Sequence, residues 1–173
     1  MSVALVTARL ALRPFAAGDL DDLFAMDGDP RVMCTIGGGM PGRTRDECAR
    51  VLERMTAYAA AHPGMGLLHA SRRDDGTFVG GCGLYPLPDG DDIEIAYRVP
   101  HPQWGRGYAT EMAIAVLAHA FDALGLARVV GVAHLANVAS QRVLTKIGMR
   151  EEGVAEHYGV AMRCFAIERA DAR

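Results

Sequence analysis

Hydrophobic and polar residues follow two periods along this chain, and segments of the two kinds alternate. A period of two predicts a half-buried strand, whereas apolar residues spaced by three and four predict an amphipathic helix. The predicted strands are Arg9–Phe15, Gly66–Arg72, Phe78–Tyr85, Ile93–Val99, Val129–Ala133, Met149–Tyr158 and Met162–Glu168. The predicted helices are Asp19–Gly28, Thr44–His62, Ala109–Leu124 and Asn137–Ile147. No repeat or linker separates them, so residues 1–173 are expected to form a single domain.

The ends of the predicted helices carry their own signals. Thr44 and Glu47 have the spacing of a capping box, and Gly125 and Gly148 follow the ends of two other helices. Between the first two helices, Pro30–Arg43 is rich in glycine and is predicted to be a loop.

The connections between strands predict a mixed sheet. Asp74-Asp75-Gly76 and Gly159 are turn signals between neighbouring strands, which makes most pairs antiparallel. Residues 93–133 instead show a strand, a glycine turn, a helix and a strand, and such a crossover joins parallel neighbours. We therefore expect an α/β (α+β) fold with a mixed, mostly antiparallel sheet of about six or seven strands and helices on both faces.

Composition and charge exclude several classes of protein. Of 173 residues, 50% are hydrophobic and 23% are charged, and no apolar run is long enough to span a membrane. Val3–Val6 has no basic segment before it and is soon followed by Arg9, so no signal peptide is expected and the chain is predicted to be cytoplasmic. A net charge of −3 argues against direct nucleic acid binding. Two acidic stretches either attract a cationic partner or are solvated loop charges; they are Asp89, Asp91 and Asp92, and Glu151, Glu152 and Glu156.

The spacing of cysteine and histidine argues against a metal site. The four cysteines include no Cys-x-x-Cys pair, so we expect reduced thiols rather than disulfides or a zinc site. The cysteines are Cys34, Cys48, Cys82 and Cys164. The six histidines also lack the spacing of metal ligands, and no metal is expected.

The segment Gln103–Glu111 joins a predicted strand to the long helix and reads Gln-Trp-Gly-Arg-Gly-Tyr-Ala-Thr-Glu. Gly105 and Gly107 let backbone amides turn toward one point, and the start of a helix adds partial positive charge there, so the turn suits a phosphate. The chain lacks the Gly-x-Gly-x-x-Gly of a dinucleotide site and the Gly-Lys-Ser/Thr of a P-loop. A plain glycine turn into a helix is the remaining alternative.

This turn and a later segment together resemble a known family. Trp104-Gly105-Arg106-Gly107-Tyr108-Ala109 precedes Asn137-x-x-Ser140 and Lys146-x-Gly148-Met149. The pattern resembles the GNAT superfamily of acyl-CoA-dependent N-acetyltransferases over Arg9–Glu168, and within it the ribosomal-protein-alanine N-acetyltransferases of the RimJ/RimL type. The resemblance implies the GNAT fold with a splayed pair of parallel strands, acetyl-CoA as cosubstrate, and a homodimer.

The resemblance also assigns residues to the cosubstrate. Amides from Gly105 to Thr110 would cradle the pyrophosphate of coenzyme A, and Ala96–Val99 would hydrogen-bond the pantetheine arm as a pseudo-strand. The implied cofactor-binding residues are Tyr97, Arg98, Val99, Trp104, Gly105, Arg106, Gly107, Tyr108, Ala109, Thr110, Asn137 and Ser140. Trp104 replaces the usual Gln or Arg and either packs against the sheet or covers the cofactor. Asn137 is equally a candidate helix N-cap.

The implied reaction requires a neutral amine. An α-amine with a pKa of about 8 costs on the order of 1 kcal/mol to deprotonate at neutral pH, whereas a lysine amine costs roughly 4 to 5 kcal/mol. A protein N-terminal α-amine is therefore the favoured acceptor, and a small-molecule amine (antibiotic, polyamine or amino acid) is the alternative. The loop Pro30–Arg43 and the final hairpin are expected to wall the acceptor pocket.

Three residues are candidates for proton transfer. Glu94 matches a strand glutamate that serves as base in some histone-acetylating relatives, and the alternative is an edge carboxylate that orients the amine. Many members of the superfamily place a tyrosine acid where this chain has Leu144, so the acid is open between Tyr158, Ser140 and no dedicated group. The missing tyrosine and the unusual Trp104 keep a second class of function open, a non-catalytic acyl-CoA sensor.

Overall fold

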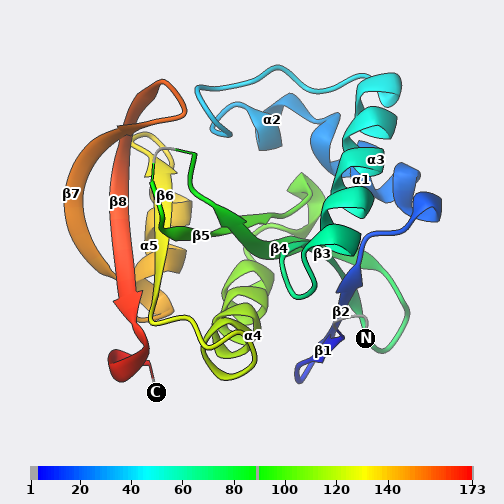
Figure 1. Ribbon diagram of the computed structural model, residues 1–173. Helices are drawn as coiled ribbons and strands as arrows, with labels where there is room; N and C mark the ends of the chain where they lie inside the picture. The colour runs from blue at the N-terminus through cyan, green and yellow to red at the C-terminus, as the bar shows by residue number, and fades with distance from the viewer. Residues whose placement is uncertain (1–3, 89, 173) are drawn as a thin grey trace.

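The computed structural model describes residues 4–88 and 90–172, so Val3 and Asp89 lie outside the described residues. The strands are β1 Leu5–Val6, β2 Leu10–Pro14, β3 Gly66–Arg72, β4 Phe78–Pro86, β5 Ile93–Arg98, β6 Arg128–His134, β7 Arg150–His157 and β8 Val160–Glu168. They form one sheet in the order β1-β2-β3-β4-β5-β6-β8-β7 (Figure 1). The predicted α/β fold with a mixed, mostly antiparallel sheet is confirmed. The two-residue β1 was not predicted, because two residues are too few to show alternation.

The helices are α1 Leu20–Asp27, α2 Pro30–Met33, α3 Arg45–Ala61, α4 Tyr108–Asp122 and α5 Val138–Lys146. In Figure 1, α4 lies below β4 and β5, whereas α2 lies above them and α1 and α3 stand to the right. Thr44 and Glu47 form the predicted capping box at the start of α3. No helix of the described chain is long and apolar enough to cross a membrane.

The prediction that Pro30–Arg43 is entirely a loop is wrong at its start, because α2 occupies its first four residues. Asp29 caps this helix by accepting a hydrogen bond from the Arg31 amide, and Pro30 stands at the first helical position. A single turn is too short to produce a helical hydrophobic period, which is why the glycine-rich composition dominated the prediction.

The two faces of the sheet bury separate cores. On one face, side chains of α4 and α5 pack against side chains of the strands. This core includes Met112, Val116 and Leu144 from the helices and Leu12, Leu84 and Ile95 from the strands. On the other face, α1, α2 and α3 enclose a smaller cluster that includes Phe15, Leu23, Met26, Val32, Leu52 and Leu67. The strands between these helix layers are therefore held from both sides, and β5 and β6 lie in the middle of the sheet.

The parallel pair β5 and β6 separates almost as soon as it forms. Among the described residues, Glu94 and Val130 are the one pair in register between these strands. On its other side, β5 pairs with β4 along all six of its residues. The edge of β5 that faces β6 is thus unpaired beyond Glu94, which is the splay that the family resemblance implied.

Close packing of β3 on β4 generates a stability prediction. A Cβ on Gly83 would lie 1.9 Å from the backbone oxygen of Gly66, a contact that no side-chain rearrangement relieves. Gly83→Ala should lower the free energy of unfolding by about 3 kcal/mol or more, measured by urea denaturation. The control is Gly18→Ala, where a Cβ meets nothing within 4 Å. Equal stability losses in the two variants would contradict this packing.

Candidate active site

The glycine turn between β5 and α4 presents a row of backbone amides. Gly105 and Gly107 have φ angles of 74° and 78°, and Gly107 caps α4. Within residues 4–88 and 90–172, no protein group accepts a hydrogen bond from the amides of residues 105–110. These amides lie at the positive end of the α4 dipole, so the turn offers the uncommitted donors that a phosphate requires.

Glu111, in the first turn of α4, ties this turn to the N-terminal strands. Its carboxylate accepts hydrogen bonds from the Thr7 hydroxyl at 2.5 Å, the Arg9 amide at 2.9 Å and Arg9 Nε at 2.6 Å. Burial raises the pKa of Glu111, but the hydrogen bonds from Thr7 and Arg9 outweigh it and lower the pKa overall. Arg9 also donates to the Arg106 carbonyl. Sequence reasoning missed this anchor because its partners lie far apart in the chain.

Trp104 follows a short 3-10 helix, His101–Gln103, between β5 and the glycine turn, and 49% of its surface is exposed. Its indole Nε1 donates to the Val99 carbonyl at 2.7 Å, and its ring lies 4.7 Å from that of His101. Trp104 is thus held beside the glycine turn by a polar contact rather than by burial in the core. Because the Val99 carbonyl already accepts this hydrogen bond, a ligand that lies along β5 would find that acceptor occupied.

Tyr97 and Asn137 place polar groups around the start of α5, on the side where β5 leaves β6. Asn137 accepts from the Ser140 amide at 3.1 Å, which confirms its role as an N-cap, and its Nδ2 donates to the Thr35 hydroxyl at 2.9 Å. Tyr97 donates to the Ser140 carbonyl at 3.0 Å, and the two hydroxyl oxygens are 2.9 Å apart. Burial raises the pKa of Tyr97. The sequence named these residues without indicating the contact between Tyr97 and Ser140.

Glu94 is a buried carboxyl on β5 with 6% of its surface exposed. The Tyr158 hydroxyl donates a hydrogen bond to Glu94 Oε2 from the turn between β7 and β8. Burial raises the pKa of Glu94 to about 7, although the bond from Tyr158 opposes this shift. Glu94 lies on the inner strand β5, at its one pair with β6, and its two candidate roles, as base or as a carboxylate that orients the amine, both remain predictions. Two residues that were proposed separately for proton transfer are therefore in direct contact.

Leu144, at the position where many superfamily members have a tyrosine, is 1% exposed and belongs to the core under α5. It packs near Gly131, where an added Cβ would lie 2.6 Å from Leu144 Cδ2. The side chain at this position therefore packs in the core and offers no hydroxyl for proton transfer. A hydroxyl from another element does reach α5, because Tyr97 on β5 contacts Ser140.

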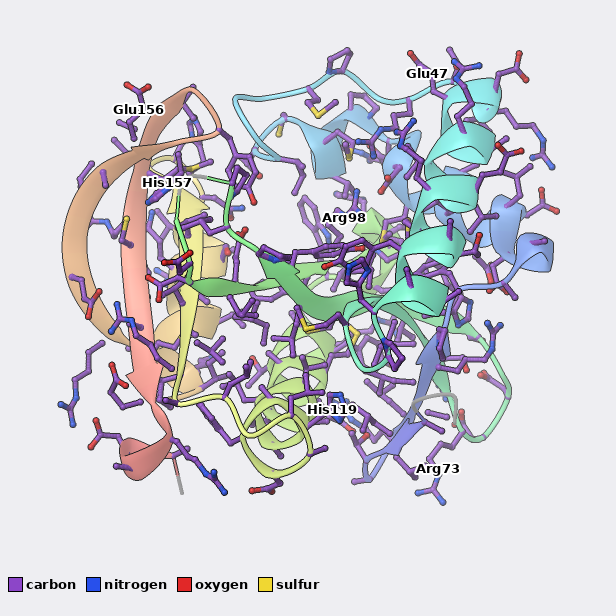
Figure 2. The ribbon with its side chains drawn as sticks, viewed as in Figure 1. Glu47, Arg73, Arg98, His119, Glu156 and His157 are labelled. Atoms are coloured by element: carbon purple, nitrogen blue, oxygen red, sulfur yellow. The ribbon has the colours of Figure 1, made fainter. Side chains whose placement is uncertain are left out.

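The segment after α2 meets the β7–β8 turn over the Glu94 side of the sheet. A Cβ on Gly38 would lie 3.2 Å from Val160 Cγ1 and 3.9 Å from the Tyr158 carbonyl oxygen, so the loop and the hairpin touch. In Figure 2, Glu156 and His157 mark the end of β7 at the upper left. Both segments that were expected to wall the acceptor pocket thus lie beside the pair formed by Glu94 and Tyr158.

Arg98, Asp27 and Arg43 form a charged triad on the same side. Asp27, at the end of α1, is fully buried. Arg98 Nη1 donates to both Asp27 oxygens, at 2.9 and 2.7 Å, and Arg43 Nη1 donates to Asp27 Oδ2. Sequence analysis assigned the backbone of Arg98 to the cofactor and did not indicate this contact of its side chain.

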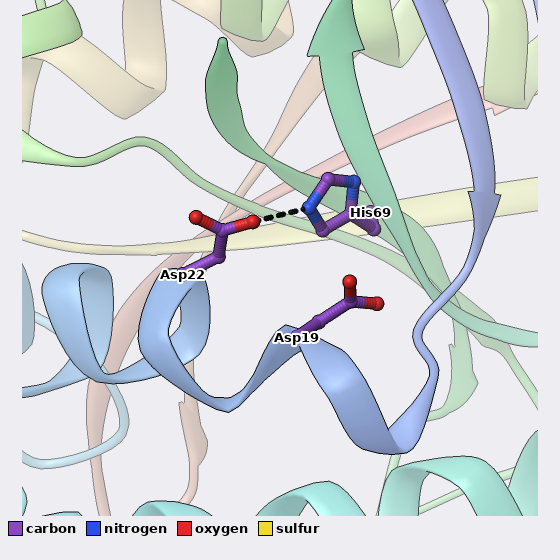
Figure 3. A group of neighbouring side chains, drawn as sticks. All are labelled: Asp19, Asp22 and His69. Atoms are coloured by element: carbon purple, nitrogen blue, oxygen red, sulfur yellow. Dashed lines mark hydrogen bonds and ion pairs between the residues drawn. The ribbon is translucent and has the colours of Figure 1, made fainter. Parts of the chain in front are cut away.

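Asp19, Asp22 and His69 form a second polar cluster (Figure 3). One ligand atom from each lies within 4.8 Å of the others, and His69 Nε2 is 2.9 Å from Asp22 Oδ2. Histidine spacing did not reveal this group because its members come from separate elements. Arg13 donates to both Asp19 oxygens, at 2.7 and 2.8 Å, so Asp19 is committed to an ion pair rather than open to a metal.

The remaining sequence expectations concern thiols and acidic side chains. All four cysteines are free, as predicted. Burial raises the pKa of Cys82, which disfavours the thiolate form of this side chain. Glu151 pairs with Arg163 at 2.5 Å, and Glu152 pairs with Arg128 at 2.6 Å. Both glutamates lie on β7 rather than in a loop and remain about half exposed, so they are solvated charges that also form ion pairs.

Comparison with known proteins identifies the family. Residues 9–150 match the profile of the acetyltransferase (GNAT) domain. The chain is 35% identical over 153 residues to the FsC-acetyl coenzyme A-N(2)-transacetylase of Aspergillus fumigatus; the match covers 84% of this chain and 64% of the relative, just under two thirds of its length. The chain therefore belongs to the GNAT family and is an acetyl-CoA-dependent N-acetyltransferase.

Solved structures agree on the fold. A GNAT-family acetyltransferase from Bacillus anthracis superposes with a TM-score of 0.82 at 23% identity, over 97% of this chain and 99% of that one. Mycobacterium smegmatis RimJ in complex with CoA-disulfide has a TM-score of 0.76 at 23% identity, over 96% of this chain and 86% of that one.

The raised pKa of Glu94 predicts a pH-dependent loss of stability. Between its usual value of 4.5 and about 7, the folded state keeps a proton that the unfolded state has lost, so the free energy of unfolding falls as pH rises through this window. Relative to Glu94→Gln, the wild type should lose on the order of 3 kcal/mol between about pH 5 and about pH 8, measured by urea denaturation. The exposed Glu53 provides the control, Glu53→Gln. A constant difference between wild type and Glu94→Gln would rule out the shifted pKa.

Proposed function

We propose that this N-acetyltransferase transfers acetyl groups to an α-amine, as enzymes of the RimJ/RimL type do with protein N-termini. Acetyl-CoA supplies the acetyl group as a thioester, so a new N–C bond forms while the C–S bond breaks. The observation that carries the proposal is the contact between buried Glu94 and Tyr158, next to a strand edge without a partner. This contact supports the proposal because two titratable groups then lie beside the strand edge that is proposed to bind the acyl donor.

The residues present fit coenzyme A. The free amides of residues 105–110 suit its pyrophosphate, and the unpaired edge of β5 from Ile95 to Arg98 suits a pantetheine arm that pairs as a short strand. Asn137 and Ser140 lie at the start of α5 beside this edge, with Tyr97 bonded to Ser140. The solved structure of a RimJ in complex with CoA-disulfide supports the assignment, because that protein shares this fold.

Glu94 is proposed as the base that takes a proton from the acceptor ammonium, directly or through water. Its pKa of about 7 lies close to the pKa of about 8 of an α-amine, so the proton moves between groups of similar affinity. A lysine amine with a pKa near 10.4 would hold its proton more tightly by roughly 3 kcal/mol. The site is therefore better matched to an α-amine.

The proton for the departing sulfur is proposed to come from Tyr158 or Ser140. Tyr158 already shares a hydrogen bond with Glu94, so a proton taken up by the carboxyl can pass toward the phenol. Ser140 lies at the start of α5, and its hydroxyl is bonded to Tyr97. A thiol pKa of about 8.5 also makes the sulfur a fair leaving group without a dedicated acid.

Replacement of the base provides a kinetic test. Glu94→Gln should lower kcat by about 100-fold, because the amide cannot accept the proton, while the Kd for acetyl-CoA stays unchanged. Steady-state rates of CoA release and calorimetry with acetyl-CoA measure the two effects. Glu53→Gln on the exposed face of α3 should match the wild type in both. Unaltered turnover in Glu94→Gln would remove the assignment.

The acceptor class is tested with three substrates in the same assay. A peptide with a free N-terminus should be acetylated about 100-fold faster at neutral pH than the same peptide with a blocked N-terminus and one lysine, because of the cost of deprotonating lysine. A polyamine is the third substrate. Preference for the polyamine or the lysine peptide would contradict the proposal. Binding of acetyl-CoA without amine-dependent release of CoA would instead indicate a sensor.

A further inference from the structure

The triad of Arg98, Asp27 and Arg43 holds one positive charge in excess, because two guanidinium groups share a single carboxylate. The Arg98 and Arg43 side chains are only 16% and 19% exposed. Charge removed from water to this extent is costly unless it finds a partner. In the described part of the chain, neither arginine forms an ion pair with any second carboxylate.

Both arginines also keep unused donors. Only Nη1 of each bonds to Asp27, and within residues 4–88 and 90–172 the Nε and Nη2 atoms of both have no hydrogen-bond partner. None of these atoms is buried from solvent. A planar guanidinium with free N–H groups binds carboxylates in a bidentate manner. An anionic group can therefore reach the triad without displacing Asp27.

The placement of Arg98 relates the triad to the proposed base. Alternate residues of a strand share a face, so Glu94, Ala96 and Arg98 lie on the same side of β5. At about 3.3 Å per residue, the α-carbons of Glu94 and Arg98 are about 13 Å apart, with the small side chain of Ala96 between them. In Figure 2, Arg98 lies centrally, between the strands and the α1–α2 segment.

This order of charges is complementary to a zwitterion. An ammonium near Glu94 and a carboxylate near Arg98 would each face a group of opposite charge on the same face of β5. Building on the proposed transfer to an α-amine, we propose that the acceptor carries a carboxylate close to that amine and that Arg98 and Arg43 bind it. A free α-amino acid and a peptide with an acidic second residue both supply this chemistry.

Matched acceptors test the proposal with the unmodified enzyme. One pair is an amino acid and its primary amide, and the other is a peptide with Asp or Asn at its second position. The carboxylate member of one pair should have a kcat/KM about 10- to 100-fold higher, mainly through a lower KM, as expected for charge-assisted hydrogen bonds. The pair that shows this difference in kcat/KM identifies whether the carboxylate belongs to a free amino acid or to an acidic second residue of a peptide.

Variants test whether Arg98 is the source of the preference for a carboxylate. Arg98→Gln should abolish the preference for the carboxylate member, whereas Arg45→Gln should keep it, because Arg45 pairs with exposed Asp21 on the surface. Arg98→Lys retains the charge next to Asp27 and should keep part of the preference if Arg98→Gln proves too unstable to assay. Thermal unfolding checks that each variant is folded.

The outcomes separate this proposal from the proposed function. Equal kcat/KM within both pairs overturns the carboxylate site and leaves α-amine acetylation intact. Absence of acetylation with every acceptor overturns α-amine transfer. Calorimetry then tests the carboxylate site by binding alone, without the need for turnover. In the presence of CoA, an N-acetyl amino acid should bind at least about 10-fold more tightly than its amide. Equal affinities, or no binding of either, would refute the role of Arg98 and Arg43.

Discussion

The separation of β5 from β6 is the constraint on which the site depends. After the pair of Glu94 and Val130, the two strands lose register, although each is held by antiparallel partners on its outer side. Buried backbone donors and acceptors without partners are costly, so an edge opened in the middle of a sheet requires compensation. In the proposed function, the pantetheine arm of coenzyme A pairs with this edge and provides that compensation. Glu94 stands where the strands still meet, which places the carboxyl at the closed end of the opening.

The start of α4 completes this arrangement. The glycine turn follows β5 after a short 3-10 helix, His101–Gln103, and leads directly into α4, so only a few residues of chain separate the free amides from the unpaired strand edge. Glu111 fixes the first turn of α4 against Arg9 and Thr7 with three hydrogen bonds. Because the turn itself contains two glycines with positive φ, such an external anchor limits the conformational freedom that those glycines would otherwise allow. The proposed anion site of backbone amides thereby gains a defined geometry.

The sequence predicted the elements more completely than the contacts between them. Hydrophobic periods located the long α3 and α4, and a local motif located the glycine turn, because each of these signals is contained in one stretch of chain. The two-residue β1 and the single turn of α2 were too short to carry a period. The triad of Arg98, Asp27 and Arg43 joins three distant segments, and no local pattern encodes such a convergence. Glu94 and Tyr158 were both recognisable as candidates, but only the folded hairpin shows that they touch.

The conformation of Tyr158 links the hairpin to the chemistry. Tyr158 and Gly159 form the two-residue connection between β7 and β8, with φ angles of 55° and 77°. This pattern is that of a type I′ turn, which favours Asn-Gly, and a tyrosine with positive φ costs on the order of 1 kcal/mol. Here the unfavourable backbone carries a phenol that donates to buried Glu94. An asparagine at position 158 would adopt this backbone conformation with less strain. Its side chain, however, is too short to contact Glu94 and has no titratable hydroxyl. Local strain in the turn is thus offset by a polar partner for a carboxyl that burial would otherwise isolate.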